Sequence, residues 1–494
     1  MTATAADWHA AADTLTFRGE ALIDGRRVPA VSGETFASHS PVDGRFLADI
    51  AACGAEDVDR AVAAARRAFT DGRWARRAPA ERKAVLVRFA ELIRAHRDEL
   101  ALTETLDMGK PISDSTSIDV RAVANCFAWY GEAIDKVYDE VAPTPSDSVA
   151  LVTREPLGVV AAVVPWNFPM LMATWKVAPA LATGNSVVLK PAEQSSLSAL
   201  RLAELALEAG IPEGVFNVVT GAGPEVGRAL GLHMDVDGLF FTGSTRVGKI
   251  FTEYAGQSNL KRLGLELGGK SPNIILSSYR DIAHAARTSA GSAFFNQGEM
   301  CTCPSRLIVE RSVHDQVVEV LLEEAKGFQP GDPLDPATRM GALVDDAHAG
   351  KVLSYVETAR EEGAIIATGG ARTRPGAYVA PTVVDGVRND MRVAREEIFG
   401  PVLSVIAVDG LEEAISVAND SPYGLASAVW TDDLTTAHRV SREIRAGLVY
   451  VNCYDCDDLT VPFGGFKESG IGRDKSLHAL DKFTELKTTW IRLG

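Results

Sequence analysis

A cysteine in a short loop is the first residue of this sequence whose type and position suit covalent chemistry. Cys301 follows Phe295–Met300, where a predicted helix ends in a glycine-containing loop ahead of the next predicted strand. Nucleophilic side chains are often held on loops between rigid elements. A single cysteine is more often a small, inert apolar residue of the interior. Cys301 therefore indicates nucleophilic catalysis only if other reactive groups accompany it.

Two further polar residues follow predicted strands. Glu266 lies in Leu263–Lys270 at the carboxyl end of a strand, and the glycines after it favour close approach of the backbone to a ligand. The alternative is a solvated charge at a strand end. Asn167 lies in the stiff turn Pro165–Pro169, where a fixed side-chain N–H suits a developing oxyanion, and the alternative is an ordinary turn asparagine.

Three segments contain residues that suit a nucleotide. Lys190 can donate to ribose hydroxyls and Glu193 can accept from them, although such a pair is usually solvated. Gly243–Gly248, which includes Ser244, opens a predicted helix whose N–H groups suit a phosphate. Gly221–Gly223 is a weaker glycine turn. The first predicted strand is not followed by G-x-G-x-x-G, so the standard dinucleotide fingerprint is absent.

Alternating strand and helix patterns predict an α/β fold. From Leu157 to Leu267 five β-branched runs alternate with helical stretches, which indicates a doubly wound parallel sheet. The runs are Gly158–Val164, Ser186–Leu189, Val215–Val219, Gly238–Phe241 and Arg262–Leu267. Helices are predicted upstream over Asp57–Phe69, Ala80–Thr105 and Ile118–Val137.

A second α/β series follows Gly268-Gly269, so we expect two doubly wound parallel-sheet domains. It is predicted to contain helix Ile282–Phe295, strand Leu307–Val309, helix His314–Gly327 and strand Leu448–Asn452. The last strand, Phe483–Leu493, has no partner nearby in the sequence. We expect it to pair with Asp147–Arg154 or with another subunit, as part of a small β extension.

Composition excludes several classes of protein. The chain has 494 residues, 46% of them hydrophobic, which is too long for one core and too apolar for disorder. Its 50 basic and 66 acidic residues give a net charge of −16, which disfavours nucleic acid as a partner. The longest apolar stretch, Leu157 to Val164, is far shorter than the ~20 residues of a membrane span. Six cysteines are too few for a disulfide framework, and we expect a cytoplasmic protein.

The motifs occur in an order that resembles the NAD(P)-dependent aldehyde dehydrogenase family from about Leu22 to Ile491. They are Phe240–Thr245, Leu265–Lys270, the Cys301 loop, Glu396–Val402 and Pro462–Lys467. The segment Gly472–Leu480 and the ending after it are similar to the gamma-glutamyl-gamma-aminobutyraldehyde and guanidinobutyraldehyde dehydrogenases. The resemblance implies an NAD-binding domain of residues 1–137 and 157–267, a catalytic domain of 268–470, and oligomerisation strands at 138–156 and 482–494. It also implies a homo-oligomer.

The resemblance assigns a role to each candidate. Cys301 attacks the aldehyde, Asn167 and the Cys301 N–H hold the oxyanion, and Glu266 activates water against the thioester. Lys176 and Asp474 stand at proton-relay positions. The implied NAD contacts are Trp166, Lys190, Glu193, Gly223, Gly243, Ser244, Glu397 and Phe399. Glu193 would repel a 2′-phosphate, so NAD is expected to be preferred.

The substrate is expected to carry a cationic end. The resemblance puts Asp119 and Asp457, with Trp129, Met172 and Trp175, around the aldehyde tunnel. Acids there would favour an amino, guanidino or gamma-glutamylamino aldehyde by charge attraction. The alternative for the acids around Asp457 is a solvated loop.

The sequence departs from the family at two positions. Many relatives carry Glu where Asp474 stands, which is one methylene longer, and Cys303-Pro304 replaces a small residue and Gly just after the nucleophile. The sequence disfavours three alternatives. A non-catalytic, crystallin-like protein would have lost Cys301 or Glu266, and a CoA-acylating relative would lack Glu266. A zinc site built from Cys301, Cys303, Cys453 and Cys456 is disfavoured because C-x-C is poor zinc spacing, so no metal is expected.

Overall fold

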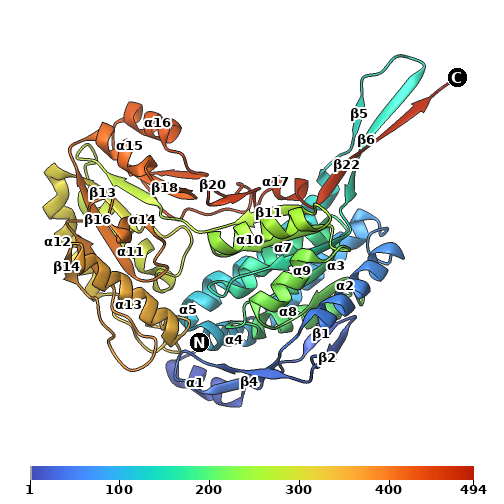
Figure 1. Cartoon of the computed structure of the whole chain (residues 1–494), viewed down its shortest axis with the longest axis horizontal. Helices are drawn as coiled ribbons and strands as arrows, with labels where there is room; N and C mark the ends of the chain where they lie inside the picture. The colour runs from blue at the N-terminus through green and yellow to red at the C-terminus, as the bar shows by residue number, and fades with distance from the viewer. Residues whose placement is uncertain (1–2) are drawn as a thin grey trace.

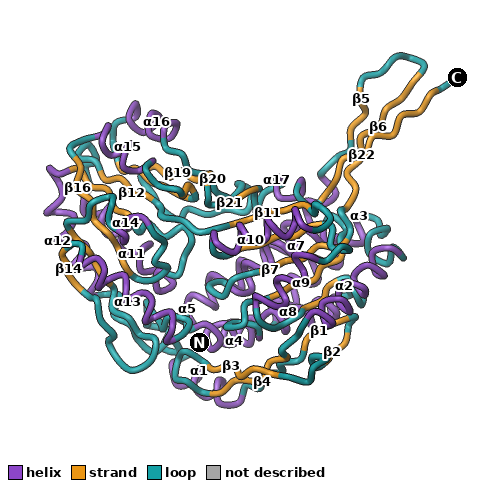
Figure 2. The backbone as a smooth tube through the Cα atoms, viewed as in Figure 1, coloured by secondary structure: helices purple, strands orange, loops and turns teal. Residues whose placement is uncertain are grey.

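The computed structural model describes residues 3–494 as two sheet domains and a projecting β arm (Figure 1). The chain begins with α1 (Ala5–Thr14) and the antiparallel pair of β3 (Thr35–His39) and β4 (Phe46–Ala51). In Figure 1 these elements run along the lower edge of the molecule. Figure 2 distinguishes the strands of both domains and of the arm, in orange, from the helices, in purple.

The first sheet has the strand order β2-β1-β9-β8-β7-β10-β11-β21. Its strands are β1 (Ala21–Ile23), β2 (Arg26–Val28), β7 (Val159–Val163), β8 (Ser186–Lys190), β9 (Phe216–Val218), β10 (Gly238–Thr242), β11 (Arg262–Glu266) and β21 (Gly470–Ile471). The parallel strands β7 to β11 confirm the five predicted runs. The chain moves outward from β7 to β9 and returns on the other side of β7 as β10. The carboxyl ends of β7 and β10 therefore flank a crevice of the kind that binds ligands in doubly wound sheets.

Helices cover both faces of this sheet because its central strands are apolar on both sides. One face carries α2 (Ala55–Thr70), π-turn Gly223–Gly227, α9 (Arg228–Leu232) and α10 (Thr245–Gln257). The other face carries α7 (Pro169–Ala182) and α8 (Leu197–Ala209). Outside these two helices lie α3 (Pro79–Ala95), α4 (Arg97–Met108) and α6 (Val120–Ala133). The single helix predicted over Ala80–Thr105 was wrong, since the chain leaves helical geometry at His96 between α3 and α4. The predicted helix Ile118–Val137 is α6, flanked by α5 (Ile112–Asp114) and π-turn Ser115–Asp119 before it and 3₁₀ turn Ile134–Lys136 after it.

The second sheet confirms the second α/β series. Its order is β14-β15-β16-β13-β12-β18-β19, parallel except for β14. The strands are β12 (Pro272–Ile275), β13 (Arg306–Glu310), β14 (Ile365–Thr368), β15 (Thr382–Asp385), β16 (Val402–Val408), β18 (Ala426–Trp430) and β19 (Leu448–Val451). α11 (Ile282–Phe294) and α12 (His314–Lys326) cover one face; α13 (Asp346–Glu361), α14 (Arg392–Arg395), α15 (Leu411–Asn419) and α16 (Leu434–Glu443) cover the other. The short pair β17 (Tyr423–Gly424) and β20 (Phe466–Lys467) leads back toward β21 in the first sheet.

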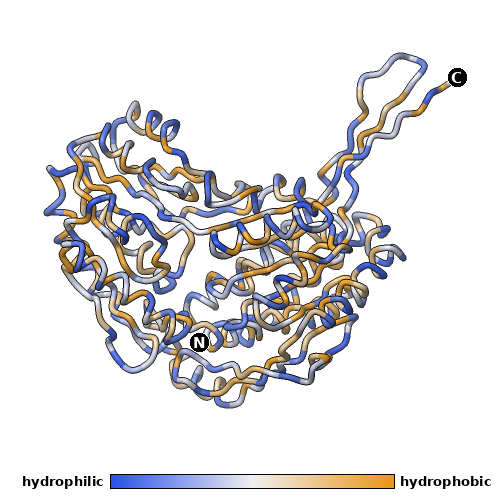
Figure 3. Tube along the Cα trace, viewed as in Figure 1, coloured by the Kyte–Doolittle hydropathy of each residue, from blue (hydrophilic) through white to orange (hydrophobic). Residues whose placement is uncertain are grey.

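The arm is a three-stranded antiparallel sheet. After α17 (His478–Asp481), β22 (Thr484–Arg492) pairs along its whole length with β6 (Ser148–Pro156), and β5 (Glu140–Ala142) pairs with the other edge of β6. Of the two partners expected for the last strand, the Asp147–Arg154 region is the one that the structure shows. The arm stands clear of both domains (Figure 1), and apolar segments alternate with polar ones along it (Figure 3).

Candidate active site

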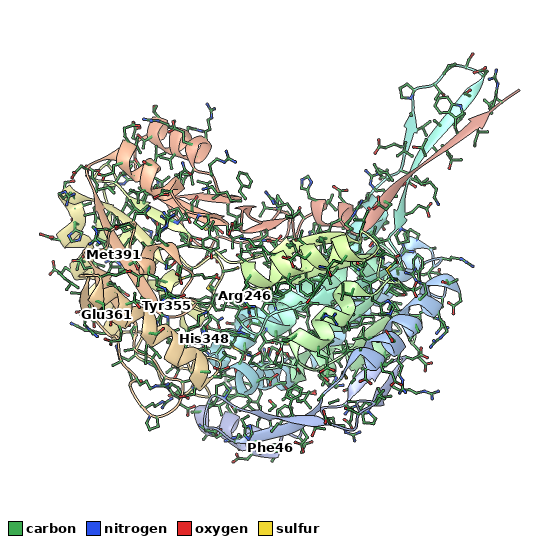
Figure 4. The ribbon with its side chains drawn as sticks, viewed as in Figure 1. Phe46, Arg246, His348, Tyr355, Glu361 and Met391 are labelled. Atoms are coloured by element: carbon green, nitrogen blue, oxygen red, sulfur yellow. The ribbon has the colours of Figure 1, made fainter. Side chains whose placement is uncertain are left out.

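A cavity of about 650 Å³ opens between the two domains at the carboxyl ends of β7 and β10. The first domain contributes the turn after β7, the start of α7 and the end of β10. The second contributes the Cys301 loop, the end of α11, and residues of α13 and of the loops after α14 and β19. Figure 4 labels His348, which lines the cavity from the end of α13 that faces the first domain.

Cys301 lies on a tightly fixed loop of the cavity wall. Asn296 and Gln297, earlier in the same loop, have positive φ values of 46° and 58°, which non-glycine residues seldom adopt. The side chain of Gln297 accepts the Gly341 N–H at 3.1 Å, and Glu299 accepts the Val344 N–H at 3.0 Å. The loop is therefore held by the second domain in a conformation that costs backbone energy.

Asn167 meets the Cys301 loop across the domain boundary. Its Nδ2 donates to the Glu299 carbonyl at 2.8 Å, and Asn296 donates from Nδ2 to the Asn167 carbonyl at 3.1 Å. Asn167 and Cys301 both line the cavity. An amide has two N–H groups, so one remains for a group bound beside Cys301.

The surroundings of Cys301 disfavour its thiolate in the free protein. Enclosure within the protein, followed by the carboxylates of Glu397 and Glu266, raises the pKa of the thiol well above its ordinary value. Reaction as a nucleophile therefore requires a base or a nearby positive charge at the moment of attack.

Four side chains, here named the Asp474 cluster, lie behind the cavity wall: the buried Glu266, Lys176 and Asp474, and the part-buried Lys482. Lys176 donates to Oδ2 of Asp474, and Lys482 donates to Oδ1. Burial opposes ionisation of Asp474, but the two lysines outweigh it and lower its pKa. Burial and then the Asp474 charge raise the pKa of Glu266 well above its usual range. Glu266 does not itself line the cavity, although Leu267 and Gly268 do.

The residues expected at the far part of the nucleotide meet at the ends of β8 and β9. Lys190 Nζ lies 3.2 Å from Glu193 Oε2, and the Gly223 N–H donates to Glu193 Oε1 at 3.2 Å. Burial opposes ionisation, but Lys190 and these donors lower the pKa of Glu193, which stays ionised and able to accept hydroxyl groups.

The remaining residues expected to contact NAD line the cavity. Ser244 is the N-cap of α10 and Gly243 precedes it. The Trp166 ring packs against Phe399, with centroids 5.3 Å apart, and against His348 at 5.2 Å. Glu397 accepts the Gly269 N–H at 3.1 Å, and burial raises its pKa to about 7. Carboxylates, a helix N-terminus and aromatic faces together fit a dinucleotide.

The structure brings only some of the predicted substrate residues to the cavity. Met172 and Trp175 of α7 line it, and so does Asp457, whose carboxylate pairs with the buried Lys475. Trp129 packs edge-on against Tyr130 and is not part of the lining.

Asp119 is the clearest departure from the predicted tunnel mouth. It is 1% exposed, and its Oδ2 accepts a hydrogen bond from Lys110 Nζ at 2.7 Å. Its neighbour Ile118 lines the cavity in its place. The π-turn at Ser115–Asp119 turns the carboxylate inward, where Lys110 neutralises it.

Sequence reasoning missed Lys482 and, among the acids near the expected tunnel, singled out Asp457 and not Asp455. Lys482 lies outside every motif. The only sequence signal for it was its position just after Gly472–Leu480, in the ending that resembles the family. Asp455 lines the cavity with a φ of 53°, accepts from Thr302 Oγ1 at 3.4 Å, and has a pKa raised by burial to about 7. Its place two residues before Asp457 was the available signal.

Residues 3–494 contain neither a metal-binding cluster nor a membrane-spanning helix. No group of three or more His, Cys, Asp or Glu side chains in that range is arranged to hold a metal ion. Within the same range, every helix is too short or too polar to span a bilayer.

Comparison with known proteins places this architecture in one family. The profile of the aldehyde dehydrogenase family matches residues 28–489. The chain belongs to the aldehyde dehydrogenase family. It is 51% identical to the NADP/NAD-dependent aldehyde dehydrogenase PuuC of Escherichia coli (strain K12), over 98% of each chain.

Two solved aldehyde dehydrogenases superimpose on the whole chain. One is gamma-glutamyl-gamma-aminobutyraldehyde dehydrogenase from Burkholderia cenocepacia J2315, with 59% identity, a TM-score of 0.98 and 100% coverage of both chains. The other is an indole-3-acetaldehyde dehydrogenase in complex with NAD⁺, with 58% identity, a TM-score of 0.99 and the same coverage.

Proposed function

We propose that this aldehyde dehydrogenase oxidises its substrate to a carboxylic acid with NAD, through a covalent intermediate on Cys301. The observation that carries the proposal is the meeting of Cys301 and Asn167 on the cavity wall, with Glu266 buried directly behind it. The order of the motifs in the chain gives independent support.

The first step forms a bond between Cys301 Sγ and the aldehyde carbon. The thiol proton passes to a base, and the carbonyl electron pair moves onto oxygen to give a tetrahedral anion. The free N–H of Asn167 and the Cys301 N–H donate to that oxygen. The donors are already oriented, because Asn167 is fixed by its bond to the Glu299 carbonyl.

Bound NAD would supply the hydride acceptor, and loss of hydride from the tetrahedral carbon would leave a thioester on Cys301. Lys190 and Glu193 would hold ribose hydroxyls, and the N-terminus of α10 after Ser244 would hold a phosphate. The Glu193 carboxylate would repel a 2′-phosphate, so kcat/KM is expected to be higher with NAD than with NADP.

Hydrolysis of the thioester is assigned to Glu266 as general base. Its carboxylate accepts a proton from water, the water oxygen bonds to the acyl carbon, and Cys301 leaves as thiolate. Because Glu266 lies behind the wall, its side chain must turn toward Cys301 to reach that water. Lys176 and Asp474 then carry the proton away from the site.

We infer that the substrate carries an amino, guanidino or gamma-glutamylamino group at its far end. Asp457 supports this, since its side chain is 59% exposed at the cavity. The 59% identity to gamma-glutamyl-gamma-aminobutyraldehyde dehydrogenase supports it as well. The Lys475 partner reduces the attraction of Asp457 for a lone ammonium.

An aromatic aldehyde is the second candidate. The cavity wall contains the rings of Phe168, Trp175, Phe295, Tyr450 and Phe463, which suit a flat apolar group. The relative named for indole-3-acetaldehyde is 58% identical to this chain.

Rates with a panel of aldehydes and both cofactors test the proposal. Cys301→Ala should abolish NADH formation, and Glu266→Gln should stop after about one NADH per site. Butyraldehyde, 4-aminobutyraldehyde and indole-3-acetaldehyde distinguish the two substrate classes by kcat/KM. Full turnover by Cys301→Ala would remove the assignment.

We further propose a homo-oligomer in a reducing, cytoplasmic setting. Leu486 and Trp490 on the arm are 64% and 61% exposed, and such apolar surface on an extended sheet suits burial against another copy. The six cysteines are unpaired, as expected where thiols stay reduced. Sedimentation of the full chain and of Trp490→Glu would measure the contribution of the arm.

A further inference from the structure

We propose that Lys482 is a positioning residue for thioester hydrolysis: its ammonium on Asp474 supplies the second positive charge that allows Glu266 to exist as a carboxylate inside the protein. This inference rests on the base role proposed for Glu266. Lys482 neither lines the cavity nor contacts Cys301, so its effect on hydrolysis is indirect.

Asp474 forms ion pairs with two lysines, one on each carboxylate oxygen. Lys176 of α7 occupies Oδ2 and Lys482, which follows α17, occupies Oδ1. The side chains of Asp474, Lys176 and Lys482 are 0%, 1% and 9% exposed, so water screens none of these contacts well. Both oxygens of the acid are therefore committed, and neither lysine can be replaced by the other.

Glu266 lacks an equivalent partner. Among the described residues its buried Oε2 accepts no hydrogen bond. A Cβ placed at Gly464 would lie 2.9 Å from Oε1, which shows how closely the backbone encloses this carboxyl group. A carboxylate in that position depends on the charges around it for stabilisation.

The charge balance decides whether Glu266 ionises. Lys176 and Lys482 contribute two positive charges and Asp474 one negative, so ionised Glu266 makes the cluster neutral. Without Lys482, ionised Glu266 and Asp474 would share one lysine in a dry interior. The other charged or titratable groups that act on Glu266 are Arg473 and the Cys301 thiol.

Arg473 does not replace Lys482. Its guanidinium donates to the carbonyls of Gly465 and Gly472, at 3.2 Å and 2.6 Å. Among the described residues it therefore donates to backbone oxygens and forms no ion pair with Glu266 or Asp474.

The position of Lys482 is set by packing. Its Nζ lies 5.6 Å from the Phe240 ring and 5.3 Å from the Phe483 ring, within the range of cation–π attraction. A Cβ at Gly264 would lie 3.4 Å from Lys482 Cδ, so this glycine leaves room for the lysine stem. The side chain thus lies beside these rings and Gly264, with its ammonium on Asp474.

Lys482→Met tests the proposal in the full-length enzyme with NAD and an aldehyde that the wild type oxidises. We expect an NADH burst of about one per site, because acylation does not need ionised Glu266. The slow phase after the burst should be about tenfold slower at pH 7, with its acid limb about one pH unit higher, since one pKa unit is tenfold in ionised fraction. Lys482→Arg should keep the acid limb near that of the wild type.

The control is Lys261→Met, which removes another buried lysine, one that donates to the Gly231 carbonyl and to Ser258. It should leave the acid limb in place. Lys482→Gln replaces Lys482→Met if that variant fails to fold, with the same expected shift. An acid limb unmoved in the folded Lys482 variant overturns the proposal, whatever the rate. Absence of any burst or turnover in the wild type would instead overturn the proposed function.

Discussion

Two buried ionic clusters flank helix α7, and they differ in charge balance. The Lys110 cluster, near the start of the helix, sets one lysine against the carboxyl groups of Glu104, Asp114 and Asp119. Burial, opposed by Lys110, raises the pKa of Glu104 to about 8, and burial raises that of Asp114 to about 7. The Asp474 cluster, at Lys176 in the same helix, has two lysines for two carboxyl groups.

The difference in charge balance corresponds to a structural role for the Lys110 cluster and a proton-transfer role for the Asp474 cluster. In the Lys110 cluster Glu104 accepts the Met170 N–H at 3.4 Å, and Lys110 Nζ lies 3.9 Å from the Phe168 ring, so the cluster fixes the turn that carries Asn167. Burial raises the pKa of Glu104 and Asp114 into the neutral range beside a single lysine that also pairs with Asp119, which suits a structural role. The balanced Asp474 cluster holds an ionised acid, which suits proton movement.

The largest expected effect is on stability. Lys110→Met leaves Glu104 and Asp119 without the lysine that contacts both, and should lower the free energy of unfolding by about 3–5 kcal/mol. Urea denaturation measures it. The exposed Lys326→Met is the control and should change stability by no more than about 0.5 kcal/mol. A loss as small as that control would show that the Lys110 cluster is not a support.

Lys176→Met should act on turnover more than on folding. Asp474 keeps Lys482 as a partner, so the stability loss should be smaller than for Lys110→Met. Loss of a proton-transfer partner should reduce kcat by about 10²-fold or more. Steady-state kinetics and urea denaturation of the two variants, measured side by side, check the contrast. Equal kcat in wild type and Lys176→Met would contradict the assignment.

Glu104→Gln should change the pH dependence of stability. The folded pKa of Glu104, about 8, is raised above the ordinary value of 4.5, so its contribution is full below pH 4.5 and is lost as pH rises toward 8. The slope is about 1.4 kcal/mol per pH unit for such a group. Unfolding free energies from pH 5 to 8 should therefore fall less steeply in Glu104→Gln. Parallel curves for the two proteins would rule out this titration.

The smallest effect concerns substrate charge. Asp457→Asn should reduce the preference for 4-aminobutyraldehyde over butyraldehyde by about two- to tenfold, because Lys475 already pairs with that carboxylate. The ratio of kcat/KM values measures it. Asp119→Asn serves as a comparison, since the buried Asp119 should leave the ratio unchanged. A preference altered by Asp119→Asn alone would restore the original tunnel-mouth prediction.

Local pattern predicted the elements better than the contacts between them. The β-branched runs marked β7 to β11, and the alternation in the last strand predicted β22, whose pairing with β6 was one of two partners left open. The motif loops led to Cys301, Asn167 and Glu266. The break between α3 and α4 at His96 could not be predicted from the sequence, because the helical spacing of apolar residues continues across it.

Ion pairs over long separations in sequence could not be predicted. Lys176 and Asp474 meet across most of the chain, and Lys482 joins them through a path between aromatic rings. Asp119 was misplaced although its partner Lys110 is only nine residues earlier, since the inward turn of its carboxylate depends on a π-turn. A sequence shows which charges exist, while packing decides which of them share a dry space.

The return of the chain to the first sheet has a consequence for biosynthesis. β11 ends at Glu266 and β21 begins at Gly470, and these residues pair as neighbours, so the second domain is an insertion between adjacent strands. During translation Lys176 and Glu266 leave the ribosome long before Asp474 and Lys482. The first domain therefore cannot complete its ionic interior until the last segment emerges, which also supplies the β22 partner of β6. A nascent chain that stalls after the second domain would carry uncompensated charge and an open strand edge, and an unpaired edge is a template for aggregation.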